Sequence, residues 1–335
     1  MKRTILIGAM LAMLTCPMVA DEAEPAYISA DAAWVVHFDV DAWGETKLEQ
    51  AILDQHPEAI PKLEEFRATF GFDLREDLHG VTLYGTGFEP GRGVAMFDAD
   101  VDRDRILDLL RENAGYETSE YGDRTIHRWI EESKPRHGEE DDGTRYGAFA
   151  AFDLVVVSRD LDDLKAALDV IDGEADSAAD AEEPVLPEAP DGAFLIARAR
   201  DLELPEGARR PRAALLKKCE ELSVTLGEKD AQVYVNIAAE METEKDARRV
   251  TKMIEGMQAF AEMAAEHARA GAEDDDGEPA KTLPVWMSSL MEAEMSGEGT
   301  KVVLEMSMPT EGLMEMAEKV REAHHGRRHE AGERE

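Results

Sequence analysis

The order of predicted elements constrains this fold more than any other feature, because strand, helix, hairpin and helix follow one another twice. Alternating apolar residues predict strands, and apolar residues three or four apart predict helices. The first copy is expected in residues 34–40, 44–70, 80–98, 102–110, 115–130, 146–158 and 160–171, and the second in residues 193–198, 210–218, 222–239, 243–270, 284–290, 292–308 and 310–324. Because hairpins build antiparallel sheets, we expect an α+β fold of two similar antiparallel units with helices packed on one face.

Short runs of residues match between the two copies. The matched pairs are residues 81–83 with 224–226, Val94 with Val235, Met96 with Ile237, and Ser158 with Ser307. Asp102 and Thr243 fall at equivalent positions before a helix, and both residue types are good N-caps. These matches predict an internal duplication.

The N-terminus has the pattern of a secretory signal over residues 1–20. Lys2 and Arg3 precede an apolar run over residues 4–16, which is too short to span a bilayer comfortably. Cys16 suggests lipidation as an alternative, but residues 13–15 lack the small residue expected just before a lipidated cysteine. We therefore expect an exported chain, periplasmic or extracellular, with no transmembrane span once the signal is removed.

Composition sets the remaining boundaries. Residues 27–172 are expected to form the first α+β unit and residues 192–324 the second. Between them, residues 173–191 are rich in alanine, acid and proline, which predicts a linker. Residues 325–335 form a charged tail.

The charge balance restricts the class of partner. The 335 residues include 74 acidic and 37 basic ones, for a formal net charge of −37. Because binding to phosphates requires a basic surface, we expect no nucleic-acid partner. A chain this acidic also raises the alternative of a cation-binding protein.

A histidine and two carboxylates recur at alternate positions near the first strand. If that strand extends far enough, His37, Asp39 and Asp41 share one face, and such a set can bind a divalent cation. The other interpretation is an amphipathic strand whose polar face meets water. On the first interpretation these three residues would form the site of a metal-dependent hydrolase.

Other patterns suggest structure more than chemistry. Gly85, Gly87, Gly91 and Gly93 superficially resemble a phosphate loop, but no GK[ST] follows, so turn glycines are the better interpretation. Removing residues 1–20 leaves Cys219 as the single cysteine, which excludes an intramolecular disulfide and suggests a small buried side chain. The sequence contains no G-x-S-x-G, H-E-x-x-H, Walker or C-x-x-C motif, and we assign no catalytic residue and no cofactor beyond a divalent cation.

The longest predicted helix covers residues 243–270. Val250, Met253, Met257, Phe260 and Ala264 recur along one stripe of it. Met241, Met253, Met257 and Met263 lie on or near this helix, and further methionines follow at positions 287, 291, 295, 306, 308, 314 and 316. The interpretation we favour is that these methionines form the core of the second unit; the alternative is an adaptable apolar groove for a peptide or lipid, because thioethers fit varied partners. At about 42 Å, the helix is longer than a small sheet is wide. Its end near Met263 and His267 should therefore project beyond the sheet, or pack on the first unit or on a partner, and we expect an apolar contact there.

Several segments together resemble a family of uncharacterised exported bacterial proteins of the planctomycete type. The segments are residues 34–40, 70–73, 78–81, Tyr121-Gly122, Ile126-His127, 166–168 and 284–316. The resemblance implies export and an α+β body, and it implies no catalytic residue. From the sequence we therefore expect an exported, non-enzymatic binding or scaffold protein with a protein, peptide or lipid partner; the metal-dependent hydrolase and the cation-binding protein stay open.

Overall fold

The computed structural model describes residues 24–131, 142–151, 153–181, 184–202, 217–273 and 285–315. The elements of the first half are η2 (Pro25–Tyr27), β1 (Trp34–Asp39), α2 (Val40–Gly44), α3 (Lys47–Gln55), α4 (Ala59–Phe70), β2 (Leu78–Gly85), β3 (Val94–Ala99), α5 (Arg103–Arg111), β4 (Glu117–Tyr121), β5 (Arg124–Ile130), β6 (Thr144–Phe149), β7 (Leu154–Ser158) and α6 (Leu161–Ile171). Those that follow are η3 (Ala178–Asp180), β8 (Ala193–Arg200), β9 (Cys219–Lys229), β10 (Gln232–Met241), α8 (Glu244–Glu273), α9 (Val285–Glu292), β11 (Glu294–Glu298) and β12 (Lys301–Pro309).

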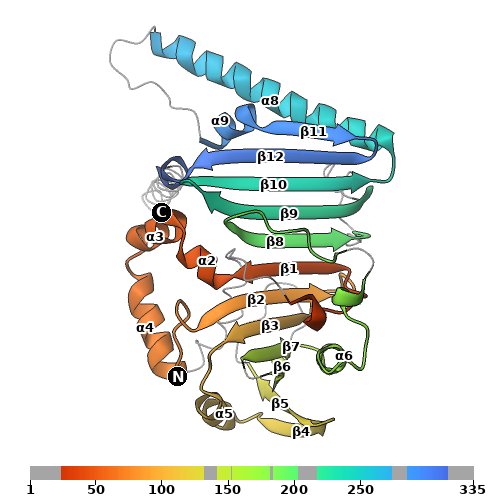
Figure 1. Cartoon of the computed structure of the whole chain (residues 1–335). Helices are drawn as coiled ribbons and strands as arrows, with labels where there is room; N and C mark the ends of the chain where they lie inside the picture. Colours follow the sequence, from red (N-terminus) through yellow and green to blue (C-terminus); the bar gives the residue numbers. More distant parts are fainter. Residues whose placement is uncertain are drawn as a thin grey trace, which may run out of the picture.

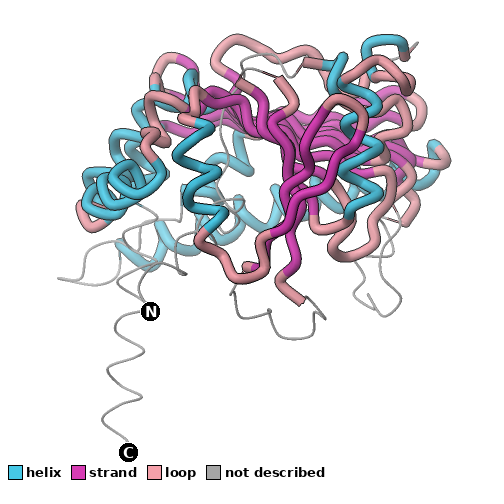
Figure 2. The backbone as a smooth tube through the Cα atoms, turned by 90° about the horizontal axis from the view of Figure 1, so that it is seen from below, coloured by secondary structure: helices cyan, strands magenta, loops and turns pink. Residues whose placement is uncertain are grey.

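The described strands form one antiparallel sheet of 12 strands in the order β11-β12-β10-β9-β8-β1-β2-β3-β7-β6-β5-β4 (Figure 1). The expected α+β class is confirmed. Seen along the stack of strands, the sheet twists strongly, so that the nearest strands cross the farther ones at a steep angle (Figure 2).

The two halves join at the centre of this sheet, where β1 pairs with β8. Moving outward from this pair, β1-β2-β3-β7-β6 has the same order as β8-β9-β10-β12-β11, and the β4–β5 hairpin is an addition at one edge. In the register, His37 lies opposite both Thr82 and Ile196, and Ile196 lies opposite Thr225. Thr82 and Thr225 are therefore equivalent in the sheet, as the sequence match predicts.

The sequence match of Val94 with Val235 is shifted by one residue from the equivalence that the structure shows. Val94 lies opposite Tyr84, whereas the equivalent position in the second half, opposite Gly227, is held by Tyr234 and not by Val235. Short runs of β-branched residues resemble one another in either register, which is why the sequence alone misplaces this pair.

Helix starts follow local capping signals. The side chain of Asp102 accepts a hydrogen bond from the backbone N–H of Arg105 at 3.1 Å, and Thr243 Oγ1 accepts one from the N–H of Asp246 at 3.2 Å. Both predicted N-caps are confirmed. At the end of α4, Gly71 has a φ of 85°, a conformation that glycine adopts at little cost.

Helices pack on both faces of the sheet. Val35 belongs to the apolar cluster that contains Leu164 of α6. Its neighbour Trp34 points to the opposite face of the sheet. Residues paired across neighbouring strands point to the same face, and a series of such pairs connects Trp34 to Val302, so Val302 lies on the same face as Trp34. Because Ala247 of α8 packs in the cluster of Val302, α6 and α8 lie on opposite faces, where the sequence led us to expect one.

The segment expected to be a linker is packed against the first half. Ala178 and Val185 are buried in the cluster of Ile28 and Leu164, and the backbone N–H of Ala178 donates to the carbonyl of Ile28 at 2.7 Å. In its described part, the segment predicted to be a linker over residues 173–191 is thus packed against the first half. Small apolar residues within this acidic segment make enough contact with the first half to hold the segment in place.

Several predicted segments lie outside the described residues: the signal over 1–20, most of the short helix over 210–218, and the tail over 325–335. The last predicted helix, over 310–324, is described only for residues 310–315, which are helical. Among the helices that the structure describes, none combines the length and apolar character needed to cross a bilayer.

Candidate functional site

His37 lies within the sheet and does not reach solvent. It is 4% exposed on β1, and its Nδ1 lies 2.8 Å from Thr82 Oγ1 on β2. Two strands thus hold this ring in place, and its described partner is a structural hydroxyl group.

Asp39 ends β1 and begins α2. Its Oδ1 accepts a hydrogen bond from the backbone N–H of Ala42 at 3.0 Å, and the residue is 2% exposed. Aspartate is a strong N-cap, so the chain turns into a helix here instead of continuing the strand. Asp41 therefore lies in α2 with an exposed side chain. The prediction that His37, Asp39 and Asp41 share one strand face is wrong.

Asp41 instead lies beside His79, a histidine to which no sequence pattern assigned a role. His79 Nδ1 lies 3.0 Å from Asp41 Oδ2, and His79 Nε2 lies 3.6 Å from Asp100 Oδ2. Partial burial alone lowers the pKa of His79, but the hydrogen bond and charge of Asp41, with Asp100 and the charge of Asp98, raise it overall. Within the described ranges, no group of three or more histidine, cysteine, aspartate or glutamate side chains is arranged so that it could hold a metal ion.

The raised pKa of His79 makes a small part of the stability depend on pH. We expect His79→Gln to lower the free energy of unfolding by less than about 1 kcal/mol, because the ion pairs are exposed. A raised folded-state pKa means that the stabilisation is complete below pH 6.5 and is lost as the pH rises through the folded value. Urea unfolding at pH 5.5 and 8.5 measures this, and a loss that grows with pH would contradict it.

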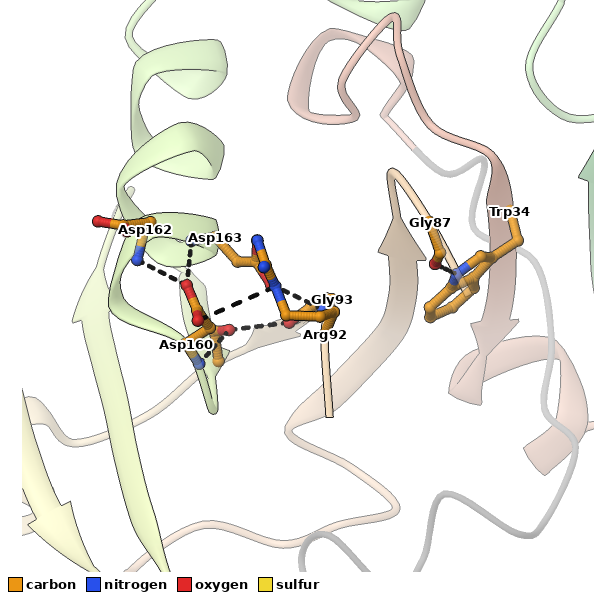
Figure 3. Close-up of polar contacts among 8 residues, drawn as sticks. Trp34, Gly87, Arg92, Gly93, Asp160, Asp162 and Asp163 are labelled. Atoms are coloured by element: carbon orange, nitrogen blue, oxygen red, sulfur yellow. Dashed lines mark hydrogen bonds and ion pairs between the residues drawn. The ribbon is translucent and has the colours of Figure 1, made fainter. Parts of the chain in front are cut away.

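Of the glycines that resembled a phosphate loop, Gly85 ends β2, and Gly87, Gly91 and Gly93 lie in the turn between β2 and β3. Gly91 and Gly93 have φ values of 83° and 120°, which favour glycine, so this interpretation is confirmed. On one side of the turn, Trp34 Nε1 donates to the carbonyl of Gly87 at 2.8 Å (Figure 3). On the other, Asp163 Oδ2 accepts from Arg92 Nε at 2.8 Å and from the N–H of Gly93 at 3.0 Å (Figure 3).

The charged part of this turn is structural. The hydrogen bond from Arg92 lowers the pKa of Asp163 below its usual value, and the bond from the N–H of Gly93 acts in the same direction. Asp160 caps α6 by accepting from the backbone N–H groups of Asp162 and Asp163 (Figure 3). The turn is thereby held against the first turn of α6.

Cys219 is buried at the start of β9, as the sequence predicts. Its thiol donates to the carbonyl of Glu221 at 2.9 Å, and burial raises its pKa above the usual value. A thiol with a raised pKa is a poor nucleophile at neutral pH, which favours a packing role.

α8 packs on the sheet through small and branched residues. Ala247, Ala261 and Ala265 are buried, and Val250 and Ile254 pack against the cluster of Val302. The amide of Gln258 fixes the helix further, because Nε2 donates to the carbonyls of Leu290 at 3.1 Å and Ala293 at 2.9 Å. Because alanine side chains are small, α8 lies close to the sheet and to α9.

The large apolar side chains of α8 face away from this core. Met253 is 42% exposed, Met257 43%, Phe260 62% and Met263 62%. Our preferred prediction placed Met241, Met253, Met257 and Met263 in the core. It is confirmed for Met241, which is buried, and wrong for the other three, because the alanine side of the helix occupies that position. We call Met253, Met257, Phe260 and Met263 the outward stripe.

The outward stripe lies on a helix at one end of the molecule. In Figure 1, α8 follows the β11–β12 end of the sheet, and its C-terminal part extends beyond the point where β11 begins. The projection expected from its length is therefore present. The sequence contained the information needed to predict the outward stripe. The apolar residues of α8 occupy more of the helix circumference than can pack against one face of a sheet, so some of them must face away from it. An exposed row of thioethers and a phenyl ring can bind an apolar partner of varied shape.

Comparisons with known proteins assign no family. No family model matches the chain, and no curated protein matches it. The structure of crystal form III of TP0453 is 10% identical, with a TM-score of 0.44 over 89% of this chain and 99% of that one. Crystal form IV of TP0453 is 9% identical, with a TM-score of 0.43 over 88% and 95% of the two chains. TM-scores below 0.5 do not establish a shared fold.

Proposed function

We propose that the chain is an exported, non-enzymatic binding or scaffold protein whose outward stripe on α8 contacts an apolar partner. The observation that carries this proposal is the exposure of four large apolar side chains in one row of a single helix. Export is proposed from the signal-like sequence of residues 1–20.

The stripe differs from ordinary surface apolar residues because it is contiguous. The other large apolar side chains exposed among the described residues, Ile52, Ile60 and Ile130, lie singly on α3, α4 and β5. Single exposed residues need no explanation, whereas contiguous patches mark interaction sites. Burying such surface yields roughly 25 cal/mol per Å².

The alternative of a hydrolase loses its geometric basis. His37 contacts Thr82 inside the sheet, and Asp39 is the N-cap of α2. The side chain of Asp41 lies beside His79 instead. Two of the three residues predicted to form a metal site thus have structural partners. This favours a binding protein over a hydrolase that uses these three residues.

The proposal is tested by photo-crosslinking in cells that produce the protein. A photoreactive phenylalanine analogue is placed at position 260, or at position 60 as a control. Position 60 is matched because Ile60 is also exposed and helical, at 46% on α4. We expect a discrete cross-linked species from position 260 and none from position 60. No cross-linked product at position 260, or equal products at both positions, would contradict the proposal.

A further inference from the structure

We propose that the three methionines of the outward stripe are sites of reversible oxidation, and that their sulfoxide forms release the apolar partner. The oxidant is a hydroperoxide, such as hydrogen peroxide, and the reductant is a dithiol. This inference rests on the proposed function, because it assigns a means of regulation to the same surface. Three observations support it: the position of methionine on α8, the protection of other sulfur groups, and the independence of the fold from the stripe.

Methionine lies on one side of α8 in the part of the helix whose side chains the structure describes. Met253, Met257 and Met263 are 42%, 43% and 62% exposed, whereas the packed side carries alanine, valine and isoleucine. The helix contains no leucine, although leucine is at least as good a helix former and has a similar volume. An apolar surface alone therefore does not require methionine. Besides its flexibility, the thioether differs from leucine in having a sulfur atom that can be oxidised.

The other described sulfur atoms are less accessible than those of the stripe. Met96 and Met241 are 4% and 2% exposed, and every described methionine outside the stripe is buried or half-buried. Cys219 is 6% exposed, and burial raises the pKa of its thiol, so little of the reactive thiolate is present at neutral pH. An oxidant in solution therefore reaches the outward stripe first.

The chemistry of the step is simple and reversible. Hydrogen peroxide transfers one oxygen atom to the thioether sulfur: the O–O bond breaks, the sulfur is oxidised by two electrons, and water leaves. In the reverse step two thiols are oxidised to a disulfide, the S–O bond of the sulfoxide breaks, and its oxygen leaves as water. Oxidation thus converts a flexible apolar side chain into a polar one, and reduction restores it.

Phe260 lies between two of these methionines. Met257 precedes it by three residues and Met263 follows it by three, which makes the three side chains neighbours on the surface of one helix. Sulfoxides at these positions would place polar oxygen atoms on both sides of the phenyl ring. An apolar partner would then bury these oxygen atoms without hydrogen bonds, which is unfavourable.

The fold does not depend on the outward stripe. Ala247 and Val250 of α8 pack in the cluster of Val302, and the amide of Gln258 donates to two backbone carbonyls near the end of α9. None of these groups belongs to the stripe. Oxidation can therefore change the binding surface while the helix stays attached to the sheet, as a reversible change requires.

The first test needs no partner. The purified full chain is treated with hydrogen peroxide, and the oxidation of each methionine is followed by mass spectrometry. We expect the three methionines of the stripe to oxidise at least about tenfold faster than Met96 and Met241, with an unchanged circular dichroism spectrum. A methionine sulfoxide reductase with dithiothreitol should restore the thioethers. Equal rates at all five positions, unfolding of the oxidised chain, or sulfoxides that are not reduced would overturn the inference.

The second test measures binding in cells through the photoreactive phenylalanine analogue at position 260. Brief treatment with hydrogen peroxide should lower the yield of the cross-linked species at least about fivefold, and the yield should recover after the peroxide is removed. The matched control carries Met253→Leu, Met257→Leu and Met263→Leu, which conserve volume and apolar character. We expect this control to form the same cross-linked species and to keep it during the treatment.

The outcomes separate this inference from the proposed function. A cross-link that peroxide leaves unchanged, or lowers equally in the leucine control, would overturn oxidation of the stripe and leave the binding surface intact. A leucine control that forms no cross-link in untreated cells would show that methionine is needed for its shape, and it would also overturn the inference. If the unsubstituted stripe gives no cross-link in untreated cells, the proposed function is contradicted and this inference fails with it.

Discussion

Replacing Glu131 with glutamine is expected to destabilise the chain by about 3–5 kcal/mol, because it breaks a fully buried ion pair. Arg145 Nη2 lies 2.8 Å from Glu131 Oε2, and the two side chains are 2% and 3% exposed. Arg145 Nη1 also donates to the carbonyl of Thr144 at 2.8 Å, so the guanidinium is held in place. Loss of the carboxylate charge removes the anion that Glu131 holds against this buried cation.

The control for this change replaces both partners at once. Glu131→Leu with Arg145→Met should cost much less than Glu131→Gln alone, because neither charge of the pair remains. Urea unfolding of these two variants and of the unchanged chain measures the difference. A single variant that loses less than about 1 kcal/mol would show that the pair is not buried as described.

The second large effect comes from comparing two adjacent positions on α8. Ala261→Glu should destabilise the chain by about 3 kcal/mol or more, because Ala261 is 1% exposed and a glutamate there buries an unpaired charge. Phe260→Glu should cost less than about 1 kcal/mol, because Phe260 is 62% exposed. Both changes introduce the same good helix former, so the comparison isolates the direction that each side chain faces.

Thermal and urea unfolding of the two variants provide the measurement, made at low protein concentration so that association does not contribute. Equal losses at both positions would mean that the packed and outward sides of α8 are assigned incorrectly. A larger loss at Phe260 would restore the earlier interpretation of the stripe as core.

Local signals in the sequence predicted much of this fold. The strand from Trp34, the hairpin glycines at 91 and 93, and the N-caps Asp102 and Thr243 are all present in the structure. Each of these features depends on a few neighbouring residues, so the sequence near it is sufficient.

Features that depend on distant contacts were missed. The pairing of β1 with β8 joins residues about 160 apart in the sequence, and no local pattern predicts it. The approach of His79 to Asp41 and Asp100 likewise follows from the register of β2 and β3 beside α2. Non-local contacts of this kind depend on which segments meet in three dimensions.

The candidate site was identified as a row of residues but assigned to the wrong side. Hydrophobicity alone ranks methionine and phenylalanine above alanine as core residues. On α8, close packing against the sheet and α9 selects Ala247, Ala261 and Ala265 instead. The larger side chains of Met257 and Phe260 therefore face solvent, and their exposure is the basis of the proposed function.

The most direct test of the account is methionine oxidation in an Ile60→Met variant, whose exposed residue 60 serves as an internal reference. In the dilute purified chain, Met257 and Met263 should oxidise about as fast as the methionine at position 60, while Met96 and Met241, 4% and 2% exposed, stay protected. In intact cells, Met257 and Met263 should be protected several-fold relative to position 60, because a partner covers the outward stripe. Equal oxidation of all three methionines in cells would contradict it.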